Sequence, residues 1–167
     1  MSDETSNAVI NSGGDWGAAH LQTYLRSGGA KGHIMDLTFV GGFPFTTHCL
    51  IKTRGRKSGK TFITALICGY INGEAVIVAS KGGADSHPAW YLNLTSREEV
   101  QLQVATDAFR ATWREPAGAE REMIWDYMVG VFPSYAGYQN STARRIPIVM
   151  MKPAEPIAVF RESDVAG

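Results

Sequence analysis

The feature that most constrains the fold is the dipeptide Asn72-Gly73, which joins two apolar segments rich in β-branched residues. Residues 61–71 precede the dipeptide, and residues 75–79 follow it as an uninterrupted apolar run. Asn-Gly between two such segments is a strong signal for a β-hairpin, because both residues tolerate the positive φ that a two-residue turn requires. The sequence therefore predicts two neighbouring antiparallel strands, of which the second is buried on both faces.

The remaining segments extend this pattern. Further strands are expected at 47–53, 100–104, 108–113 and 146–151, with a turn near Thr106 and Asp107. Helices are expected at 15–26, 88–94 and 117–131, and a loop or short helix at 133–145. Consecutive hairpins predict an α+β fold that is mainly antiparallel, a split β-barrel with two or three flanking helices. Rossmann and P-loop folds are excluded, since neither of their glycine-rich motifs occurs.

The chain divides into four parts. Residues 1–14 are rich in serine, asparagine and glycine and are expected to be disordered. Residues 15–46 form an N-terminal helix and connecting loop, and residues 47–153 form the split barrel. Pro153 is expected to end the last strand, which leaves 154–167 as a C-terminal tail. Five aromatic residues make the second part a possible cover for an apolar pocket: Trp16, Tyr24, Phe39, Phe43 and Phe45.

Composition limits the classes of partner and the compartment. Sixteen basic and sixteen acidic residues give a formal charge of zero, so nothing favours nucleic acid as a partner. The two cysteines, Cys49 and Cys68, lie in apolar segments without a CxxC motif, which favours buried free thiols over a disulfide. No apolar run reaches the ~20 residues of a membrane span, and the polar N-terminus does not resemble a signal peptide. We expect a cytoplasmic monomer or homodimer.

Two glycine-rich loops follow predicted strands and carry cations. The first lies within 52–60, where five of nine residues are basic, and its candidate ligand-binding residues are Arg56, Lys57, Ser58 and Gly59. The second contributes Ser80, Lys81, Gly82 and Gly83. Glycine lets the backbone approach an anion closely, and successive amides can form an anion-binding nest. The first loop alone is more simply a solvated basic turn, but together the two loops favour a small ligand that carries phosphate.

Four aromatic or imidazole side chains are candidates for a pocket. Tyr135 and Tyr138 share a face if their segment is helical, and each offers a ring for stacking and a hydroxyl. Trp90 could form a wall beside a planar ligand, and His48 could point into the pocket by strand alternation. Ordinary packing is the alternative for each of them. The histidines show no HxxxH or HExxH spacing, so we predict no metal site.

Five motifs together resemble the deazaflavin (F420)-dependent nitroreductase family. They are GRKSG at 55–59, VASKGGA at 78–84, PAWYLNL at 88–94, PSYAGYQ at 133–139 and RIPIV at 145–149. The resemblance covers roughly residues 45–152, and the combination is specific although each motif alone is weak. It implies a split β-barrel related to FMN-binding folds. It also implies an oxidoreductase that transfers hydride from reduced F420 to a small apolar or aromatic acceptor such as an enone, a quinone or a nitro compound.

The resemblance also implies roles for individual residues. Lys57 and Ser58 would bind the phosphate and tail of the coenzyme. The residues expected to line the coenzyme are Ser80, Lys81, Gly82 and Gly83, with Ala89 and Trp90 beside its ring system. Tyr135 and Tyr138 would border the substrate pocket, and Tyr135 or Ser80 would orient the acceptor carbonyl or help to supply a proton. The candidates for catalysis are Tyr135, Tyr138, Ser80 and His48.

Four positions depart from the family pattern. Phe62 stands where an arginine is usual, and Ala65 where a proline is common. Ile67 and Phe132 occupy positions where the family has tyrosines. The chain therefore lacks one phosphate contact and two pocket hydroxyls, and we expect a more apolar pocket.

These losses leave other functions open. Without any coenzyme, His48, Tyr135 and Ser80 could carry out acid–base isomerisation or elimination on an apolar carbonyl compound. Use of FMN, or non-catalytic binding of a flavin-like or haem-like ligand, are further alternatives. The basic segment 52–60 suits the tail of F420 better than FMN, because that tail carries more negative charge.

Overall fold

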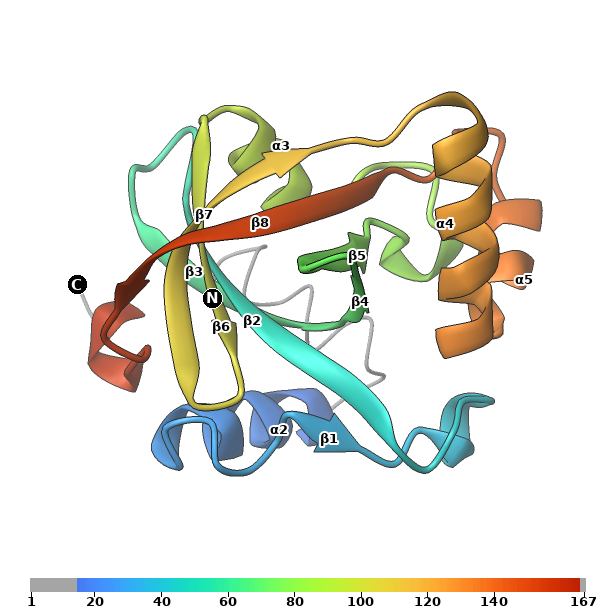
Figure 1. Cartoon of the computed structure of the whole chain (residues 1–167). Helices are drawn as coiled ribbons and strands as arrows, with labels where there is room; N and C mark the ends of the chain where they lie inside the picture. The colour runs from blue at the N-terminus through green and yellow to red at the C-terminus, as the bar shows by residue number, and fades with distance from the viewer. Residues whose placement is uncertain (1–14, 166–167) are drawn as a thin grey trace.

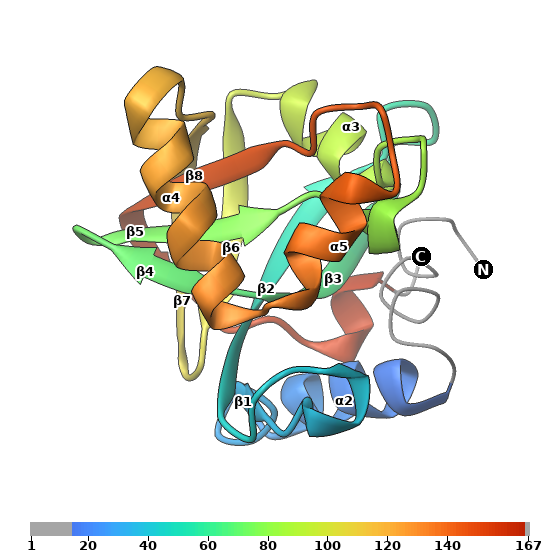
Figure 2. The ribbon, with the colours of Figure 1, turned by 90° about the vertical axis from the view of Figure 1, so that its right-hand side faces the viewer.

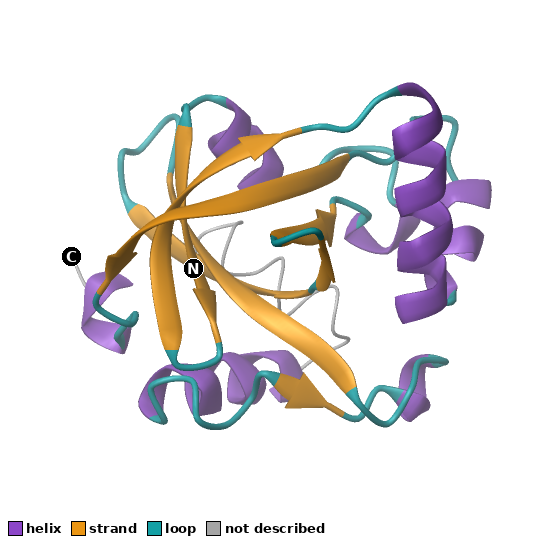
Figure 3. Ribbon diagram, viewed as in Figure 1, coloured by secondary structure: helices purple, strands orange, loops and turns teal. Residues whose placement is uncertain are grey.

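Strand β2 (Thr46–Arg54) is the branch point of the sheet, because it pairs with three other strands. Its partners are β1 (Ile34–Met35), β3 (Thr61–Ile67) and β6 (Glu99–Val104). The computed structural model describes residues 15–165 (Figures 1 and 3). The segment predicted to be disordered, 1–14, lies outside the described residues.

Every strand pairing in the described part is antiparallel. The other strands are β4 (Gly69–Ile71), β5 (Glu74–Val78), β7 (Asp107–Arg114) and β8 (Ile148–Ile157). The strand order is β1-β2-β6-β7-β8-β5-β4, with β3 on the free edge of β2, and the sheet curls into a split barrel (Figure 1). Asn72 and Gly73 have φ values of 51° and 81° at the β4–β5 turn, as the hairpin prediction requires. The predicted fold class is confirmed.

Within the described residues 15–165, four α-helices pack around the barrel, rather than the two or three expected. They are α2 (Asp15–Arg26), α3 (Ala89–Thr95), α4 (Gly118–Val131) and α5 (Ser134–Asn140). The fourth arises because part of 133–145, predicted as a loop or short helix, forms α5. Short 3-10 helices are η1 (Thr38–Val40), η2 (Lys81–Gly83) and η3 (Glu162–Val165). Helices α4 and α5 lie together on one side of the barrel, and α2 lies below it (Figure 2).

Alternate residues of β5 and β8 contribute to two separate hydrophobic cores, because successive side chains of a strand point to opposite faces. Odd-numbered positions pack inside the barrel with Trp90 and Leu94 of α3: Ala75, Ile77, Val149 and Met151. Even-numbered positions face α4 and α5: Val76, Val78, Ile148 and Met150. The prediction that the strand after Asn72-Gly73 is buried on both faces is therefore confirmed, since that strand is β5.

The single strand expected at 61–71 is two strands, β3 and β4, separated at Cys68. The Cys68 amide donates to the Thr47 carbonyl at 2.9 Å, and the Thr47 hydroxyl donates to the Cys68 carbonyl. These two hydrogen bonds replace the regular strand pairing at the corner where β3 ends its pairing with β2 and β4 begins to pair with β5. Apolar residues continue through the corner, so the sequence pattern alone did not reveal it.

The prediction that Pro153 ends the last strand is wrong, because β8 continues to Ile157. Pro153 lies opposite Ala111 of β7. Pairing of β8 with β5 extends only to Met151, so beyond that residue one edge of β8 has no strand partner. A proline is tolerated there, because its missing N–H is not needed by a second neighbour.

The C-terminal segment is also more than a tail. Phe160 is fully buried in a third core with Leu50 of β2 and Ile63 of β3. Its amide donates to Gln103 Oε1 at 2.7 Å, and Lys52 Nζ lies 4.5 Å from the centre of its ring. The segment therefore closes one side of the barrel.

Two expectations from composition agree with the described residues. Cys49 and Cys68 are buried free thiols, as predicted. Within residues 15–165, none of the helices has the length and apolar character needed to cross a bilayer.

Tyr24 fixes α2 to the barrel. Its side chain is fully buried, and its hydroxyl donates to the His48 carbonyl at 3.2 Å. The same oxygen accepts from the Ala105 amide at 2.9 Å, at the tip of the β6–β7 hairpin. One phenol thus satisfies a backbone carbonyl of β2 and a backbone amide of a turn.

We expect Tyr24→Phe to lower the free energy of unfolding by about 2 kcal/mol, because it leaves a buried carbonyl and a half-buried amide without their partner. Tyr127→Phe is the matched control. Tyr127 also bridges the amide and carbonyl of one residue, Tyr70, but it is 38% exposed, so water can replace its hydroxyl. Urea unfolding measures both, and equal losses would contradict the docking role of Tyr24.

Candidate functional site

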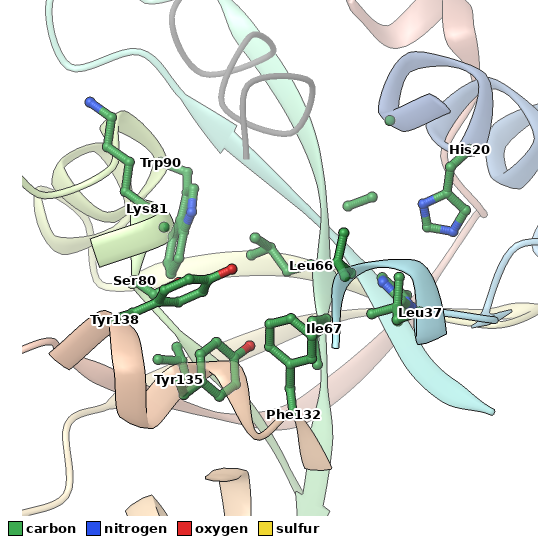
Figure 4. Close-up of a pocket in the computed structure, with 16 residues that line it drawn as sticks. His20, Leu37, Leu66, Ile67, Ser80, Lys81, Trp90, Phe132, Tyr135 and Tyr138 are labelled. Carbon is green, nitrogen blue, oxygen red and sulfur yellow. The ribbon is translucent and has the colours of Figure 1, made fainter. Parts of the chain in front are cut away.

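A pocket of about 120 Å³ lies between the barrel, α5 and the N-terminal segment (Figure 4). Its wall is mostly apolar, and the apolar side chains come from five different parts of the chain. They are Leu37, Val40, Ala65, Leu66, Ile67, Val78, Trp90 and Phe132. The polar side chains on the wall are His20, His48, Ser80, Lys81, Tyr135 and Tyr138. Six predicted site residues with functional side chains therefore line one cavity: His48, Ser80, Lys81, Trp90, Tyr135 and Tyr138.

Tyr135 and Tyr138 point their hydroxyls into this pocket from α5 (Figure 4). Their ring centroids are 6.3 Å apart at 70°, and Phe132 packs edge-on against Tyr135 at 5.2 Å. Burial raises the pKa of Tyr135 well above its usual range and also raises the pKa of Tyr138, so both phenols keep their protons. Neither hydroxyl bonds to another described residue. The pair therefore offers two hydrogen-bond donors to a ligand.

The segment 79–84 is held from one side by Arg144. The guanidinium donates from Nε to the Ala84 carbonyl at 2.7 Å and from Nη2 to the Ser80 carbonyl at 2.7 Å. Nη1 donates to the Ala79 carbonyl at 3.2 Å and to Nδ1 of His87 at 3.0 Å. The RIPIV motif pointed to the neighbouring Arg145, which is exposed. Arg144 was missed because a residue in a polar loop gives no sign of which carbonyls it will reach.

The amide side of the same segment is open. The amides of Gly83 and Ala84 donate to the carbonyls of Ser80 and Lys81, but those of Lys81 and Gly82 bond to no carbonyl in the described part. Since Lys81 and Gly82 line the pocket, these amides can meet a ligand there. The Lys81 ammonium itself points away from the tyrosines and lies 3.4 Å from Ser86 Oγ (Figure 4).

Gly83 serves packing rather than the pocket wall. Its φ is 84°, and a Cβ there would lie 2.9 Å from the Tyr138 carbonyl oxygen and closer still to Ser141 Oγ. Only glycine combines this conformation with this close approach. Gly83 therefore seats η2 against α5, which also sets the position of Tyr138 relative to Ser80.

The first basic loop does not share this wall. Arg56, Lys57, Ser58 and Gly59 are exposed in the β2–β3 hairpin and are absent from the pocket lining. The two glycine-rich loops therefore do not line one common cavity. The loop is tied instead to α3, because the Arg56 amide and Nη1 both donate to Asn93 Oδ1 at 3.0 Å. Ala89, at the start of α3, is half-buried and also outside the lining.

His48 lies on the wall at the opposite end from the tyrosines, beside His20 of α2. The two ring centroids are 4.8 Å apart at 76°. Burial, and then the neighbouring His20, lower the pKa of His48 to about 4, and burial also lowers the pKa of His20. Both rings are therefore neutral near pH 7. Sequence reasoning missed His20, although it lies one helical turn before the buried Tyr24.

The departures from the family pattern have two structural outcomes. Ala65, Ile67 and Phe132 all lie on the pocket wall, which accounts for its apolar character. Phe62 is buried beneath the first basic loop, where a Cβ on Gly55 would lie 2.8 Å from its ring. Phe62 thus supports the backbone of that loop but offers no charge.

Residues of the N-terminal segment do reach the pocket, but not the three phenylalanines expected. Phe39, Phe43 and Phe45 are exposed and absent from the pocket lining. Leu37 and Val40, at either end of η1, and His20 of α2 contribute instead. The short turn at η1 points its smaller aliphatic residues inward, which periodicity could not predict for so irregular a stretch.

A profile of the family described as "F420H(2)-dependent quinone reductase" matches residues 19–153. The chain belongs to this family. The matched residues include most of α2, the whole pocket wall apart from Gly17, and the barrel as far as Pro153. The predicted family resemblance is therefore confirmed.

Individual relatives agree with this assignment. A putative F420H(2)-dependent quinone reductase of Mycobacterium tuberculosis is 29% identical over 104 residues, which are 62% of this chain and 87% of that protein. The solved structure of the F420-H2 dependent reductase FDR-A is 39% identical, covers 63% of this chain and 93% of its own, and has a TM-score of 0.58. A structure described as a domain-swapped dimer is 34% identical in sequence. The match covers 83% of this chain and 98% of that one, with a TM-score of 0.61.

Membership makes the protein an F420-dependent oxidoreductase, as predicted. The pocket residues fit the coenzyme, since the open amides of η2 and the ring of Trp90 line the same mostly apolar cavity, as a planar ligand with a polar edge requires. Coenzyme-free acid–base chemistry, use of FMN and simple ligand carriage are not favoured.

We expect Arg144→Lys to lower the free energy of unfolding by about 2 kcal/mol, because one ammonium cannot donate to three carbonyls placed around a planar guanidinium. Arg145→Lys, at the exposed neighbouring position, should change it by less than about 0.5 kcal/mol. Urea unfolding of both variants tests this difference. Similar values for the two would argue against the bracing role of Arg144.

Proposed function

We propose that this protein reduces quinone-like acceptors, with the coenzyme ring against η2 and Trp90 and the acceptor between that ring and the tyrosines of α5. When bound, reduced F420 supplies the hydride, which is chemistry that the protein side chains cannot provide. The observation that carries the proposal is the pair of unpartnered phenols, Tyr135 and Tyr138, at one end of an apolar cavity.

The phenols suit the oxygen of a quinone. A carbonyl oxygen only accepts hydrogen bonds, and Tyr135 and Tyr138 keep their protons because burial raises their pKa values. Negative charge that develops on this oxygen during reduction is stabilised by donors already in place, in a pocket with little water. Since its pKa is raised, Tyr135 is better suited to donate a hydrogen bond than to release its proton.

The coenzyme is held by backbone and ring rather than by the Lys81 ammonium. The amides of Lys81 and Gly82 would bind a polar edge of the ring, and Ser80 lies beside them. Arg144 supports this arrangement, because it engages the carbonyls of the same segment and leaves the amides facing the pocket. The apolar faces of Trp90 and Val78 complete the site.

The tail of the coenzyme would extend over α3 to the first basic loop. Trp90 lines the pocket, and Asn93, one turn further along α3, holds Arg56 by two hydrogen bonds. One turn of α3 therefore separates the proposed position of the coenzyme ring from the first basic loop. Lys57 is exposed on this loop, where its ammonium can meet the anionic tail together with Ser58 and Gly59.

We also place the protein in the cytoplasm and assign it a homodimeric state. Two buried free thiols suit a reducing compartment, and a relative of 34% identity is described as a domain-swapped dimer. Size-exclusion chromatography with light scattering tests the second statement.

The test of the proposed function is oxidation of reduced F420 followed by absorbance, with a naphthoquinone, an enone and a nitroaromatic as alternative acceptors. We expect the naphthoquinone to give the highest kcat/KM. Tyr135→Phe should lower kcat/KM about tenfold, with Tyr138 still in place, and should change the Kd for F420 less than twofold. Tyr127→Phe, outside the pocket, is the control for a phenol lost elsewhere. No oxidation with any acceptor would refute the proposal, and full activity of Tyr135→Phe would reduce that residue to a pocket wall.

Lys57→Ala tests the proposed path of the tail. We expect F420 to bind about tenfold more weakly at low salt and the difference to shrink at high salt, because exposed charges are screened. Lys152→Ala removes the same charge from an exposed position on β8 and should leave the Kd unchanged. Fluorescence titration with oxidised F420 measures both variants. An unchanged Kd for Lys57→Ala would place the tail elsewhere.

A further inference from the structure

The end of the pocket opposite the tyrosines is formed by two histidines whose hydrogen bonds fix their protonation. His20 Nε2 lies 2.6 Å from the Gly32 carbonyl oxygen, and His48 Nδ1 lies 3.0 Å from the Thr46 carbonyl oxygen. A carbonyl oxygen can only accept, so each of these nitrogens carries a hydrogen. The other nitrogen of each neutral ring, Nδ1 of His20 and Nε2 of His48, therefore has a free lone pair.

Among residues 15–165, neither lone pair has a hydrogen-bond partner. In the part of the chain that the structure describes, no hydrogen bond reaches either nitrogen, although both side chains line the pocket. Burial keeps both rings neutral near pH 7, so the two nitrogens accept hydrogen bonds but do not donate them. An acceptor left without a donor in a pocket is costly when a ligand displaces its water.

The pocket thus has opposite hydrogen-bonding character at its two ends. Tyr135 and Tyr138 donate at one end, and the two imidazoles accept at the other. Figure 4 shows His20 across the cavity from the tyrosines, with Leu66 and Ile67 between them. A ligand that matches both ends has a carbonyl at one end, an apolar ring system in the middle and a hydroxyl at the other end.

We propose that His20 and His48 form a specificity subsite that selects quinones carrying a hydroxyl on the ring remote from the reduced carbonyl. The proposal rests on the proposed function, since the tyrosine end is assigned to that carbonyl. A phenolic O–H at this position donates to an imidazole nitrogen. A methyl ether of the same shape cannot donate, and it also leaves the nitrogen without water.

Binding to the protein saturated with oxidised F420 tests this without turnover. The probes are a naphthoquinone with a hydroxyl on the ring that lacks the carbonyls, its methyl ether, and the unsubstituted naphthoquinone. Isothermal titration calorimetry gives each Kd. We expect the wild-type protein to bind the hydroxylated compound about tenfold more tightly than the ether, which is the net contribution of one hydrogen bond.

Two substitutions remove the acceptor nitrogen and keep the structural bond. The amide nitrogen of His48→Asn takes the place of Nδ1 and can still donate to Thr46, and that of His20→Gln takes the place of Nε2 and can still donate to Gly32. Each variant should lower the tenfold preference to about threefold, and the double variant should abolish it. The unsubstituted naphthoquinone is titrated against each variant as the reference for any general change of the pocket, and the ratio of the hydroxyl Kd to the ether Kd is the readout. Thermal melts identify any variant that fails to fold, and the other single variant then carries the test.

The outcomes separate this inference from the proposed function. Equal Kd values for hydroxyl and ether in the wild-type protein, or a preference that survives in the double variant, would overturn the subsite. Turnover of the unsubstituted naphthoquinone with reduced F420 tests the function independently, because that compound makes no use of the histidines. A retained hydroxyl preference without turnover would overturn the function and leave the subsite standing.

Discussion

The pairing of β5 with β8 is the constraint on which the pocket depends. Where they pair, both strands are buried on both faces, so a slip of one residue would move each paired side chain from the barrel interior to the α4–α5 face or the reverse. This fixed register places Val78 opposite Ile148 and brings the end of β5 beneath α5. The chain then turns directly into η2, so the open amides of Lys81 and Gly82 start from a rigid position. Catalytic precision here comes from a doubly buried strand pair rather than from the loop itself.

The segment after β5 shows how a short loop can turn its backbone carbonyls to one side and its backbone amides to the other. Arg144 engages its carbonyls from one side, and Gly83 presses its end against α5. The amides of Lys81 and Gly82 then face the cavity by default. The same principle operates at the far end, where two backbone carbonyls fix which nitrogen of each histidine carries the hydrogen. In both places backbone groups, rather than charged side chains, decide what a ligand meets.

The sequence predicted most of the fold because the decisive signals are local. Asn72-Gly73, the alternating segments and the family motifs each act within about ten residues, and they led to the barrel, to F420 and to Tyr135, Tyr138, Ser80, Trp90 and His48 as pocket residues. The failures involve contacts between distant segments. His20 reaches the pocket only because Tyr24 docks α2 on the barrel, and Pro153 is tolerated only because β8 has lost its second neighbour there. The separation of the two glycine-rich loops likewise depends on where α3 packs, and no spacing along the chain encodes that.

The buried position of Phe160 has a consequence for how the protein is made. Its ring fills the core shared by α2, β2 and β3, and its amide completes the bonding of Gln103. During synthesis, α2 and the early strands emerge from the ribosome long before this residue, and their shared core stays open to water until it arrives. Stable docking of α2 is therefore expected only after Phe160, a residue far downstream of α2, has been translated. Since α2 carries His20, the pocket acquires this part of its wall only after that point.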